Sequence, residues 1–369
     1  MIKYPYKVRD FMKKIGRQVF FIPAEGNNTR NGEGSFIRLK NGNILFGYTE
    51  FIDDNREDEA HAVISAFTSV DEGESWDNKR VLFQKSENAV NIMSLSFLPM
   101  ENGDIGAFYI EKNMDGTDNI IFRRSPDDGL SWSESVSCTD CLESDYYILN
   151  NDRVIRLLNG RILLPLALHT RHNTDLELSP GVVLFVCSDD DGKTWKQVGD
   201  KLSCPFPNNP LGFQEPGLFQ MDDGMLWLYI RTGLGFQFQA FSTDNGESWS
   251  DPEPNTFFSS PSSPMLVKKF KDLTLAVFNP VPEHILREDD EEFWGRTPYT
   301  LAVSHDNGKS FARENLFFIE DDLNNGYCYP AIITGDDYCL MAYYHSNNTD
   351  CCLNSTKIIK ISYNELTNP

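Results

Sequence analysis

An eight-residue pattern that recurs five times constrains this 369-residue chain more than any other feature. Each copy reads Ser-x-Asp-x-Gly-x-Ser/Thr-Trp/Phe, and its aspartates are Asp71, Asp127, Asp190, Asp244 and Asp306, spaced 56, 63, 54 and 62 residues apart. The pattern is typical of a hairpin turn, because Asp can accept hydrogen bonds from turn N–H groups and Gly can adopt a positive φ. Five copies at a near-constant period predict a repeat architecture, and not the two or three domains that the length alone suggests.

A second turn signal precedes each of the five copies, and a sixth such turn marks a last unit, after Tyr327, that has no copy of the pattern. These turns divide each unit into strands. These turns, each followed by an apolar run, are Asn41-Gly42, Asn102-Gly103, Asn159-Gly160, Asp223-Gly224, Lys271-Asp272 and Asp336-Asp337. Each repeat therefore reads as four antiparallel strands, which is the pattern of a β-propeller blade. We predict an all-β, six-bladed β-propeller as a single domain over residues 1–369, with an N-terminal extension over 1–17 and blades over 18–369. The strand Gln18–Ile22 is expected to complete the last blade and close the ring, which removes an exposed sheet edge.

The order of the strands predicts which face of the propeller carries function. If the strands of a blade are named A to D, the A–B and C–D turns lie on one face. Residues that enter strand A, leave strand B or belong to the B–C loop lie on the other. The first face carries short, repeating turns, which the structure requires. The second carries longer, non-repeating loops rich in charged residues, and such loops are where binding and catalytic residues concentrate.

The acidic composition argues against two classes of partner. The formal net charge is −22, whereas nucleic acids and anionic membranes both need a basic protein surface. The N-terminus lacks the apolar core of a signal peptide, and no run of about 18 apolar residues occurs, so we expect a cytoplasmic protein without a membrane span. The eight cysteines are then expected to be reduced thiols. Cys138 and Cys141 form one CxxC pair, which alone is a weak zinc signal, and we predict no metal or cofactor.

Acids, arginines, tyrosines and histidines gather on the second face. Strands A are entered at segments that include Arg30-Asn31-Gly32-Glu33, Asn150-Asn151-Asp152-Arg153, Gln214-Glu215-Pro216 and Tyr327-Cys328-Tyr329-Pro330. Strands B end at Glu50, Lys112, His169, Arg231, Asn279 and His345, and the B–C loops hold Asp53, Asp54, Asp58, His61, Arg171, His172 and Arg296. This density of reactive side chains around one pore mouth predicts a functional site there.

The chain resembles the sialidase (neuraminidase) superfamily, and within it the predicted-neuraminidase branch of Asp-box (BNR) repeat proteins. The five repeated turns match the Asp box, and the resemblance covers nearly the whole chain. More specific are Glu215 followed sixteen residues later by Arg231, and Arg296 followed thirty-one residues later by Tyr327. Sialidases have a similar Glu and Arg across blade four, and a similar Arg and nucleophilic Tyr across blades five and six.

The resemblance implies a glycosidase for a sugar that carries a carboxylate. Arg30, Arg231 and Arg296 would bind that carboxylate through their planar guanidinium groups. A Tyr nucleophile suits such a substrate, because a carboxylate nucleophile would be repelled by it. A phenol needs a base to take its proton. The resemblance therefore implies Tyr327 as the nucleophile and Glu215 as its base.

The acid/base residue that protonates the leaving oxygen is expected in the B–C loop of blade one. Asp58 is the first candidate, with Asp54 and Glu59 as alternatives and His61 as a neighbour that could tune it. Further substrate contacts are expected from Asp152, Arg153 and His169, although Asp152 and Arg153 could instead form an internal ion pair.

Two positions depart from the sialidase pattern and leave alternatives open. The F/Y-R-I-P signature that supplies the first arginine is absent, so Arg30 could instead be a loop residue paired with Glu33, and Arg153 could replace it. Tyr329 competes with Tyr327 for the role of nucleophile.

The sequence thus predicts an exo-acting glycoside hydrolase for a terminal acidic sugar, with sialic acid as the leading candidate. Two alternatives stay open. One is a hydrolase or lyase of another glycan that contains uronate or rhamnose, and the other is a non-catalytic glycan-binding propeller. The separation of Glu215 and Tyr327 is the deciding observation, because a base must lie within hydrogen-bond reach of the proton that it takes.

Overall fold

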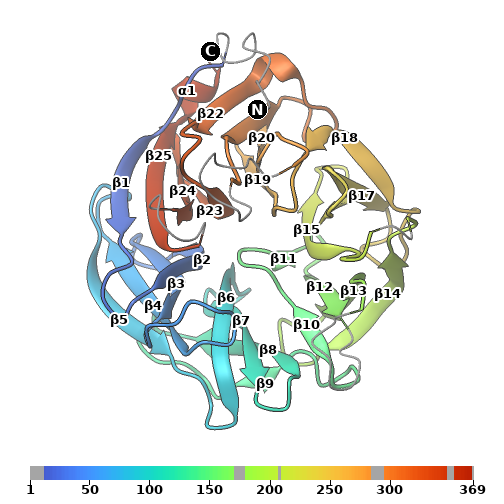
Figure 1. The fold of residues 1–369 in the computed structure, drawn as a ribbon. Helices are drawn as coiled ribbons and strands as arrows, with labels where there is room; N and C mark the ends of the chain where they lie inside the picture. The colour runs from blue at the N-terminus through green and yellow to red at the C-terminus, as the bar shows by residue number, and fades with distance from the viewer. Residues whose placement is uncertain (1–11, 170–178, 207–208, 284–294, 347–352, 368–369) are drawn as a thin grey trace.

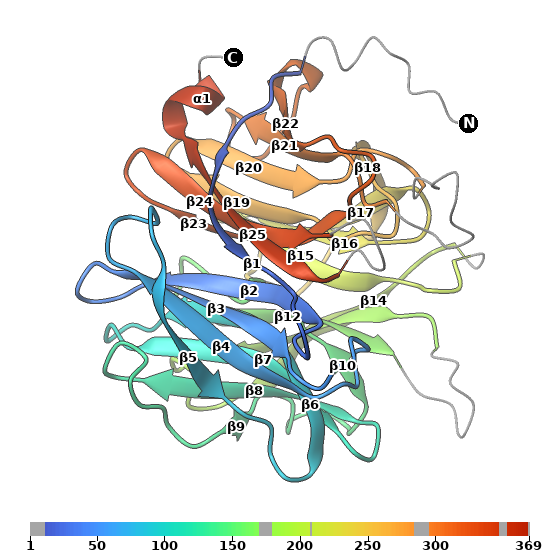
Figure 2. The ribbon, with the colours of Figure 1, turned by 60° about the vertical axis from the view of Figure 1, so that its left-hand side comes forward.

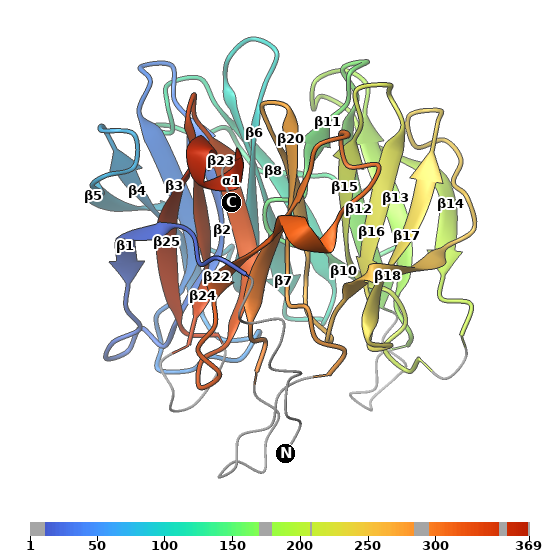
Figure 3. The same ribbon diagram turned by 90° about the horizontal axis from the view of Figure 1, so that it is seen from above.

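Six antiparallel sheets surround a central axis as the blades of a propeller (Figure 1). The computed structural model describes residues 12–169, 179–206, 209–283, 295–346 and 353–367. The strands run between two opposite faces of the ring, so that their connections gather on those faces (Figure 3). The prediction of an all-β, six-bladed propeller with four antiparallel strands per blade is confirmed, except that blade three has a divided inner strand.

In blades one to three the strands follow chain order from the ring centre outward. Blade one consists of β2 (Arg30–Arg38), β3 (Ile44–Phe51), β4 (Ala62–Ser69) and β5 (Asp77–Phe83). Blade two consists of β6 (Ala89–Pro99), β7 (Ile105–Asn113), β8 (Asp118–Ser125) and β9 (Val136–Ser137). Blade three consists of β10 (Tyr146–Ile148) and β11 (Ile155–Arg156), which share the inner position, then β12 (Ile162–His169), β13 (Val182–Ser188) and β14 (Lys196–Ser203).

Blades four to six follow the same order. Blade four consists of β15 (Gln214–Gln220), β16 (Leu226–Arg231), β17 (Phe236–Ser242) and β18 (Glu253–Ser259). Blade five consists of β19 (Leu266–Phe270), β20 (Leu273–Phe278), β21 (Tyr299–Ser304) and β22 (Leu316–Glu320). Blade six consists of β23 (Tyr327–Thr334), β24 (Tyr338–His345), β25 (Ser355–Ser362) and β1 (Arg17–Ile22). The short helices are η1 (Arg313–Asn315) and α1 (Tyr363–Thr367), and no helix in the described ranges is long and apolar enough to cross a membrane.

The ring is closed by a strand from the start of the chain. β1 pairs antiparallel with β25, from Arg17 opposite Lys360 to Ile22 opposite Thr356, and the two strands run side by side in Figure 2. Blade six therefore joins the N-terminal strand to three strands from the C-terminal end, as predicted. This pairing covers an edge of β25 that would otherwise present unpaired backbone groups.

The Asp boxes are hairpin turns held by their own side chains. In the first box, Asp71 accepts the N–H and the hydroxyl of Ser75 at 2.9 and 2.6 Å, and the Gly73 N–H donates to Ser69 Oγ at 2.8 Å. Gly73 has φ +83°, as predicted, and Glu72 before it also has a positive φ of +58°. Two consecutive positive φ values are what a type I′ turn requires. The same bonds recur around Asp127, Asp190, Asp244 and Asp306.

The box carboxylates are expected to make the fold sensitive to acid. Hydrogen bonds from the serine or threonine four residues later lower the pKa of Asp71, Asp127 and Asp190 to about 2. Because the ordinary pKa of Asp is about 4, this stabilisation is present above about pH 4 and is lost as the pH falls towards about 2. We expect the melting temperature to fall across that interval, and an Asp71→Asn variant to lose less across it than the wild type. Thermal unfolding followed by circular dichroism tests this, and equal losses in both proteins would contradict it.

Candidate active site

Four inner strands carry a β-bulge at the same place on the face opposite the Asp boxes. In β2, β6, β15 and β23 the register with the next strand shifts near the start of the strand. The residue in each bulge has a positive φ, and these residues are Glu33 (+51°), Ser94 (+60°), Glu215 (+43°) and Tyr329 (+53°). A non-glycine residue in this conformation costs about 1–3 kcal/mol, and such residues cluster at functional sites. The bulges therefore mark this end of the pore as a constrained site.

Glu215 and Tyr329 meet across the pore in a short hydrogen bond. The Tyr329 hydroxyl donates to Glu215 Oε1 at 2.6 Å, while Arg231 Nη1 lies 2.7 Å from Glu215 Oε2 and 3.4 Å from the Tyr329 oxygen. Burial pushes the pKa of Glu215 up, but Arg231, the Tyr329 hydroxyl and Arg296 together lower it overall, so the carboxylate is ionised at neutral pH. Burial, together with Glu215, raises the pKa of Tyr329 well above its usual value. The resting pair is a protonated phenol whose proton points at an ionised base.

Arg296 lies against the ring of Tyr329. Its guanidinium carbon is 5.4 Å from the ring centroid, and its Nη1 is 3.1 Å from Cys328 Sγ. Ser262 connects the two arginines of this region, because its carbonyl accepts from Arg296 Nη2 at 3.3 Å and its hydroxyl from Arg231 Nε at 3.1 Å. Two permanent positive charges are thus held beside one phenol.

Arg30 is buried and holds the acidic groups on the blade-one side. Its Nη2 is 2.5 Å from Glu33 Oε1, its Nη1 is 2.6 Å from Asp58 Oδ1, and its Nε donates to Tyr344 Oη at 2.9 Å. Ser94 donates its hydroxyl to the second oxygen of Glu33. Arg30 is therefore paired with Glu33, as one interpretation of the sequence held, and it also lines the same cavity as Tyr329.

Asp58 is the residue of the blade-one B–C loop that faces this cavity. Its side chain is 51% exposed. Partial burial pushes the pKa of Asp58 up, but the Arg30 guanidinium and the Lys112 ammonium lower it overall. The other acid/base candidates of this loop, Asp54 and Glu59, and their neighbour His61 are not among the described residues that line the cavity.

A cavity of about 80 Å³ opens between these groups, with walls from five blades. One part of the wall is charged or polar and is formed by Arg30, Glu33, Asp58, Lys112, Glu215 and Tyr329. Another part is apolar and is formed by Met93, Ile110 and Ile148. A small concave site with convergent polar groups and an apolar wall is the usual form of a small-ligand site.

Asp118 and Tyr146 also line the cavity but were not among the predicted site residues. Lys112 Nζ donates to Tyr146 Oη at 3.2 Å, and its ammonium interacts with Asp58 and Asp118. Asp118 begins strand C of blade two and Tyr146 begins strand A of blade three. Strand order places both starts on the functional face, so this rule could have identified them.

Tyr327 packs in the core beside blade five and does not enter the cavity. It is fully buried, and its ring centroid is 5.4 Å from that of His345. The expected pairing of Glu215 with Tyr327 is absent, because Glu215 is bonded to Tyr329. Residues two apart share a face in a regular strand. The register shift after Cys328 interrupts that alternation, which is why only Tyr329 turns into the cavity.

Asp152 and Arg153 bond to protein groups near the ring axis and do not line the cavity. Asp152 accepts from Ser35 Oγ at 2.9 Å and from the Ile332 N–H at 3.2 Å, and Lys268 Nζ is 3.1 Å from its carboxylate. Arg153 donates from Nη2 to a backbone carbonyl of blade five at 2.5 Å. Their placement favours the internal alternative over substrate contact, with Lys268 as the ionic partner of Asp152.

His169 ends β12 as a buried residue, outside the cavity wall. Its Nδ1 is 3.2 Å from the Ser179 carbonyl oxygen, and burial lowers its pKa, so its ring is neutral at pH 7. Arg171 and His172 lie outside the described residues. Among the residues that the structure describes, no group of three or more His, Cys, Asp or Glu side chains could hold a metal ion.

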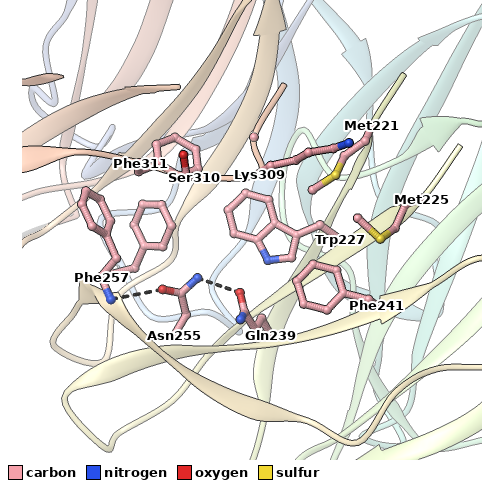
Figure 4. Close-up of a pocket in the computed structure, with 12 residues that line it drawn as sticks. Met221, Met225, Trp227, Gln239, Phe241, Asn255, Phe257, Lys309, Ser310 and Phe311 are labelled. Atoms are coloured by element: carbon pink, nitrogen blue, oxygen red, sulfur yellow. Dashed lines mark hydrogen bonds between the residues drawn. The ribbon is translucent and has the colours of Figure 1, made fainter. Parts of the chain in front are cut away.

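A larger cavity of about 270 Å³ lies on the Asp-box face between blades four and five (Figure 4). Its wall is mainly apolar, with the aromatic side chains of Trp227 and Phe257 among its members. Phe311, which stands at the box position that is Trp in the other four boxes, is part of this wall. The charged residue in this wall, Lys309, is paired with Asp223 at 2.8 Å. The described residues that line this cavity include no Asp, Glu, His, Cys or Tyr, so we place the candidate site on the other face.

Comparison with known proteins agrees with the propeller fold. The family of BNR repeat-like domains matches residues 51–345. The anhydrosialidase of Macrobdella decora is 28% identical over 145 residues, which are 37% of this chain and 17% of that protein. The sialidase of Bacteroides fragilis (strain YCH46) is 22% identical over 222 residues, which are 58% of this chain and 37% of that protein. The chain thus spans well under two thirds of the length of either relative.

Solved structures share the whole propeller. The leech intramolecular trans-sialidase in complex with 2,7-anhydro-Neu5Ac superposes with a TM-score of 0.73 at 15% identity, and the match covers 96% of this chain and 71% of that one. At this identity the likeness shows the fold alone. The family match, by contrast, extends over most of the six blades. The chain belongs to the family of BNR repeat-like domains, in the sialidase superfamily.

Proposed function

We propose that this protein is an exo-acting, sialidase-like glycoside hydrolase that releases terminal sialic acid with retention, with Tyr329 as the nucleophile. The observation that carries the proposal is the 2.6 Å hydrogen bond from Tyr329 to Glu215, beside the guanidinium groups of Arg231 and Arg296. A phenol with a base in contact is an activated nucleophile. Its arginine neighbours provide the charge that an anionic sugar requires.

The reaction needs two proton transfers in each half. In the first half, Tyr329 Oη attacks the anomeric carbon and passes its proton to Glu215, while the bond to the leaving oxygen breaks and Asp58 protonates that oxygen. In the second half, a water molecule gives a proton to Asp58 and attacks the same carbon. The bond to Tyr329 then breaks, and Glu215 returns the proton to the phenol. Two displacements at one carbon leave its configuration unchanged.

Arg30 and Asp58 are coupled in the free protein. Arg30 donates to four protein groups: the Tyr344 hydroxyl, the Arg56 carbonyl, and the carboxylates of Glu33 and Asp58. A substrate carboxylate that binds Arg30 would take the place of Asp58. Asp58 would then lose its counter-ion and gain a negative neighbour, which raises its pKa and favours the protonated acid that the first step needs.

Release of 4-methylumbelliferone from its α-sialoside tests the proposed reaction. The wild-type protein is expected to release it, and proton NMR of the first product is expected to show the α-anomer of sialic acid. The same assay with 4-methylumbelliferyl glucuronide separates sialic acid from another acidic sugar. A protein that is inert on this sialoside and on both α2,3- and α2,6-sialyllactose would rule out the proposed function.

Asp58→Asn is expected to discriminate between leaving groups. The variant should lose about 100-fold or more of kcat/KM on α2,3-sialyllactose, because a sugar alkoxide leaves poorly without a proton. It should lose only about tenfold on the 4-methylumbelliferyl sialoside, because that phenolate leaves readily. Steady-state kinetics on both substrates measure the two losses. Equal losses would argue against Asp58 as the general acid, and Glu59→Gln serves as the control in the same loop.

A further inference from the structure

A short segment of blade three lies at the centre of the ring and contacts its neighbours on several sides. In Figure 1 the chain next to β11 reaches into the middle of the ring. The Asp152 N–H donates to the Leu95 carbonyl of blade two at 3.1 Å, and Arg153 Nη2 donates to the Met265 carbonyl beside blade five at 2.5 Å. The Arg153 guanidinium carbon is 5.6 Å from the ring centroid of Tyr229 in blade four. We call residues 150–153 the central segment.

Asn151 in the central segment joins blade one to blade six. Its side-chain amide donates to the Gly34 carbonyl at 2.9 Å and to the Pro330 carbonyl at 3.2 Å. Gly34 directly follows Glu33, and Pro330 directly follows Tyr329, so one amide contacts the residue after each bulge. Asn151 is fully buried, so water cannot easily replace its amide as the hydrogen-bond donor to these two carbonyls.

Asp152 makes a second link between the same two bulges. One carboxylate oxygen accepts from Ser35 Oγ at 2.9 Å, and the other accepts from the Ile332 N–H at 3.2 Å. Ser35 is the first residue beyond the bulge of β2, and Ile332 is the second residue beyond the bulge of β23. Lys268 balances the charge of Asp152 at 3.1 Å. A bulge withdraws backbone groups from the ladder, and buried groups of this kind need another partner. Asn151 supplies such partners to Gly34 and Pro330, and Asp152 joins the strands just beyond the two bulges.

We propose that Asn151 and Asp152 are positioning residues that hold the bulges of β2 and β23 at a set separation, so that Tyr329 stays in contact with Glu215. We call the contacts of Asn151 and Asp152 with these two strands the clamp. Each bulge residue is strained by its positive φ and is kept in place by its surroundings. Without the clamp a regular strand register becomes the favourable alternative, and a shift of one residue turns a side chain to the other face. The catalytic meaning of this inference rests on the proposed function.

Asn151→Ala tests the clamp, with Asn209→Ala as the matched control. Asn209 is also a buried amide that donates to a backbone carbonyl, that of Gly212 at 2.8 Å, but it lies between blades three and four. We expect Asn151→Ala to lower kcat about 100-fold with KM changed by less than about threefold, and Asn209→Ala to change kcat by less than about threefold. KM should change little because Ser262, which lies outside the central segment, still bonds to Arg231 and Arg296 in the variant.

A second readout does not depend on activity. The ¹³Cζ resonance of Tyr329, assigned by its loss in Tyr329→Phe, reports the hydrogen bond to Glu215. We expect this resonance to shift in Asn151→Ala and to keep its wild-type position in Asn209→Ala. An unshifted resonance in folded Asn151→Ala, with kcat equal to that of the control, would overturn the positioning role. A wild-type protein that hydrolyses no sialoside would end the proposed function, whereas this resonance would still decide the role of the clamp.

Asp152→Asn provides a milder variant if Asn151→Ala does not fold. It keeps the shape of the side chain but removes the charge that faces Lys268 and one of the two acceptors. We expect the same shift of the Tyr329 resonance and a loss of about tenfold in kcat. A folded Asp152→Asn protein with a wild-type resonance would remove Asp152 from the clamp.

Discussion

Tyr329→Phe is expected to lower kcat/KM for sialoside hydrolysis at least about 1,000-fold, whereas Tyr327→Phe should keep it within about threefold. Tyr329 donates its proton to Glu215 at 2.6 Å and lines the cavity. Tyr327 is fully buried and contributes its ring to the core beside blade five. The two residues lie two positions apart in β23, so the pair of variants shows which of the two tyrosines is the nucleophile.

Covalent labelling provides the direct measurement for this prediction. A 2,3-difluorinated sialic acid, which forms a slowly hydrolysed bond to the nucleophile, should add its sugar mass to the wild-type protein and to Tyr327→Phe. Peptide mapping should place the label on Tyr329, and Tyr329→Phe should remain unlabelled while still binding a non-hydrolysable sialic acid analogue. A label on Tyr327, or activity that survives in Tyr329→Phe, would contradict the assignment.

Glu215→Gln is expected to lower kcat by about 100- to 10,000-fold, because an amide cannot take the phenol proton. The pKa of Glu215 is lowered in the folded protein, since Arg231, Tyr329 and Arg296 together outweigh the effect of burial. Its ionised form therefore persists as the pH falls through the ordinary range of a Glu carboxyl, near about 4.3. The contribution of Glu215 to the acidic limb of the wild-type profile of kcat/KM should consequently lie below that value, and Glu215→Gln should lack it.

Glu320→Gln is the matched control for Glu215→Gln. Glu320 is also buried, accepts from the Tyr343 hydroxyl at 2.7 Å and pairs with Lys357 at 2.5 Å. It therefore repeats the combination of tyrosine, glutamate and cation at a place outside the candidate cavity. We expect Glu320→Gln to reduce the melting temperature without changing the pH profile. Parallel profiles of kcat/KM for the two variants would show that Glu215 is not the base.

Most of the fold could be predicted because its signals are local. Each Asp box contains its hydrogen-bonding partners within eight residues, and the carboxylate of Asp71 needs only Ser69 and Ser75 to define the turn. The order of strands then follows from counting turns, and with it the face that holds Arg30, Glu215 and the other candidates. The closing strand was likewise predictable, because an unpaired outer strand needs a partner.

The identity of the inward-facing tyrosine could not be predicted in this way. Tyr327 and Tyr329 are two residues apart, so a regular strand would treat them alike. The bulge that separates them places a non-glycine residue at a positive φ, and neither Tyr329 nor Glu215 carries a local sequence signal for that conformation. Only the interactions around the strand impose it.

The sequence by itself determined the number of blades, the positions of the turns and the face on which the candidate residues lie, because hairpin chemistry acts between residues close in the chain. The tertiary structure alone decided which side chains share the cavity and which bond to other protein groups near the ring axis. Asp152 contacts Ser35 across 117 residues and the backbone of Ile332 across 180. Such contacts exist only after the ring has closed, because they join residues far apart in the chain, and they bind Asp152 to protein groups.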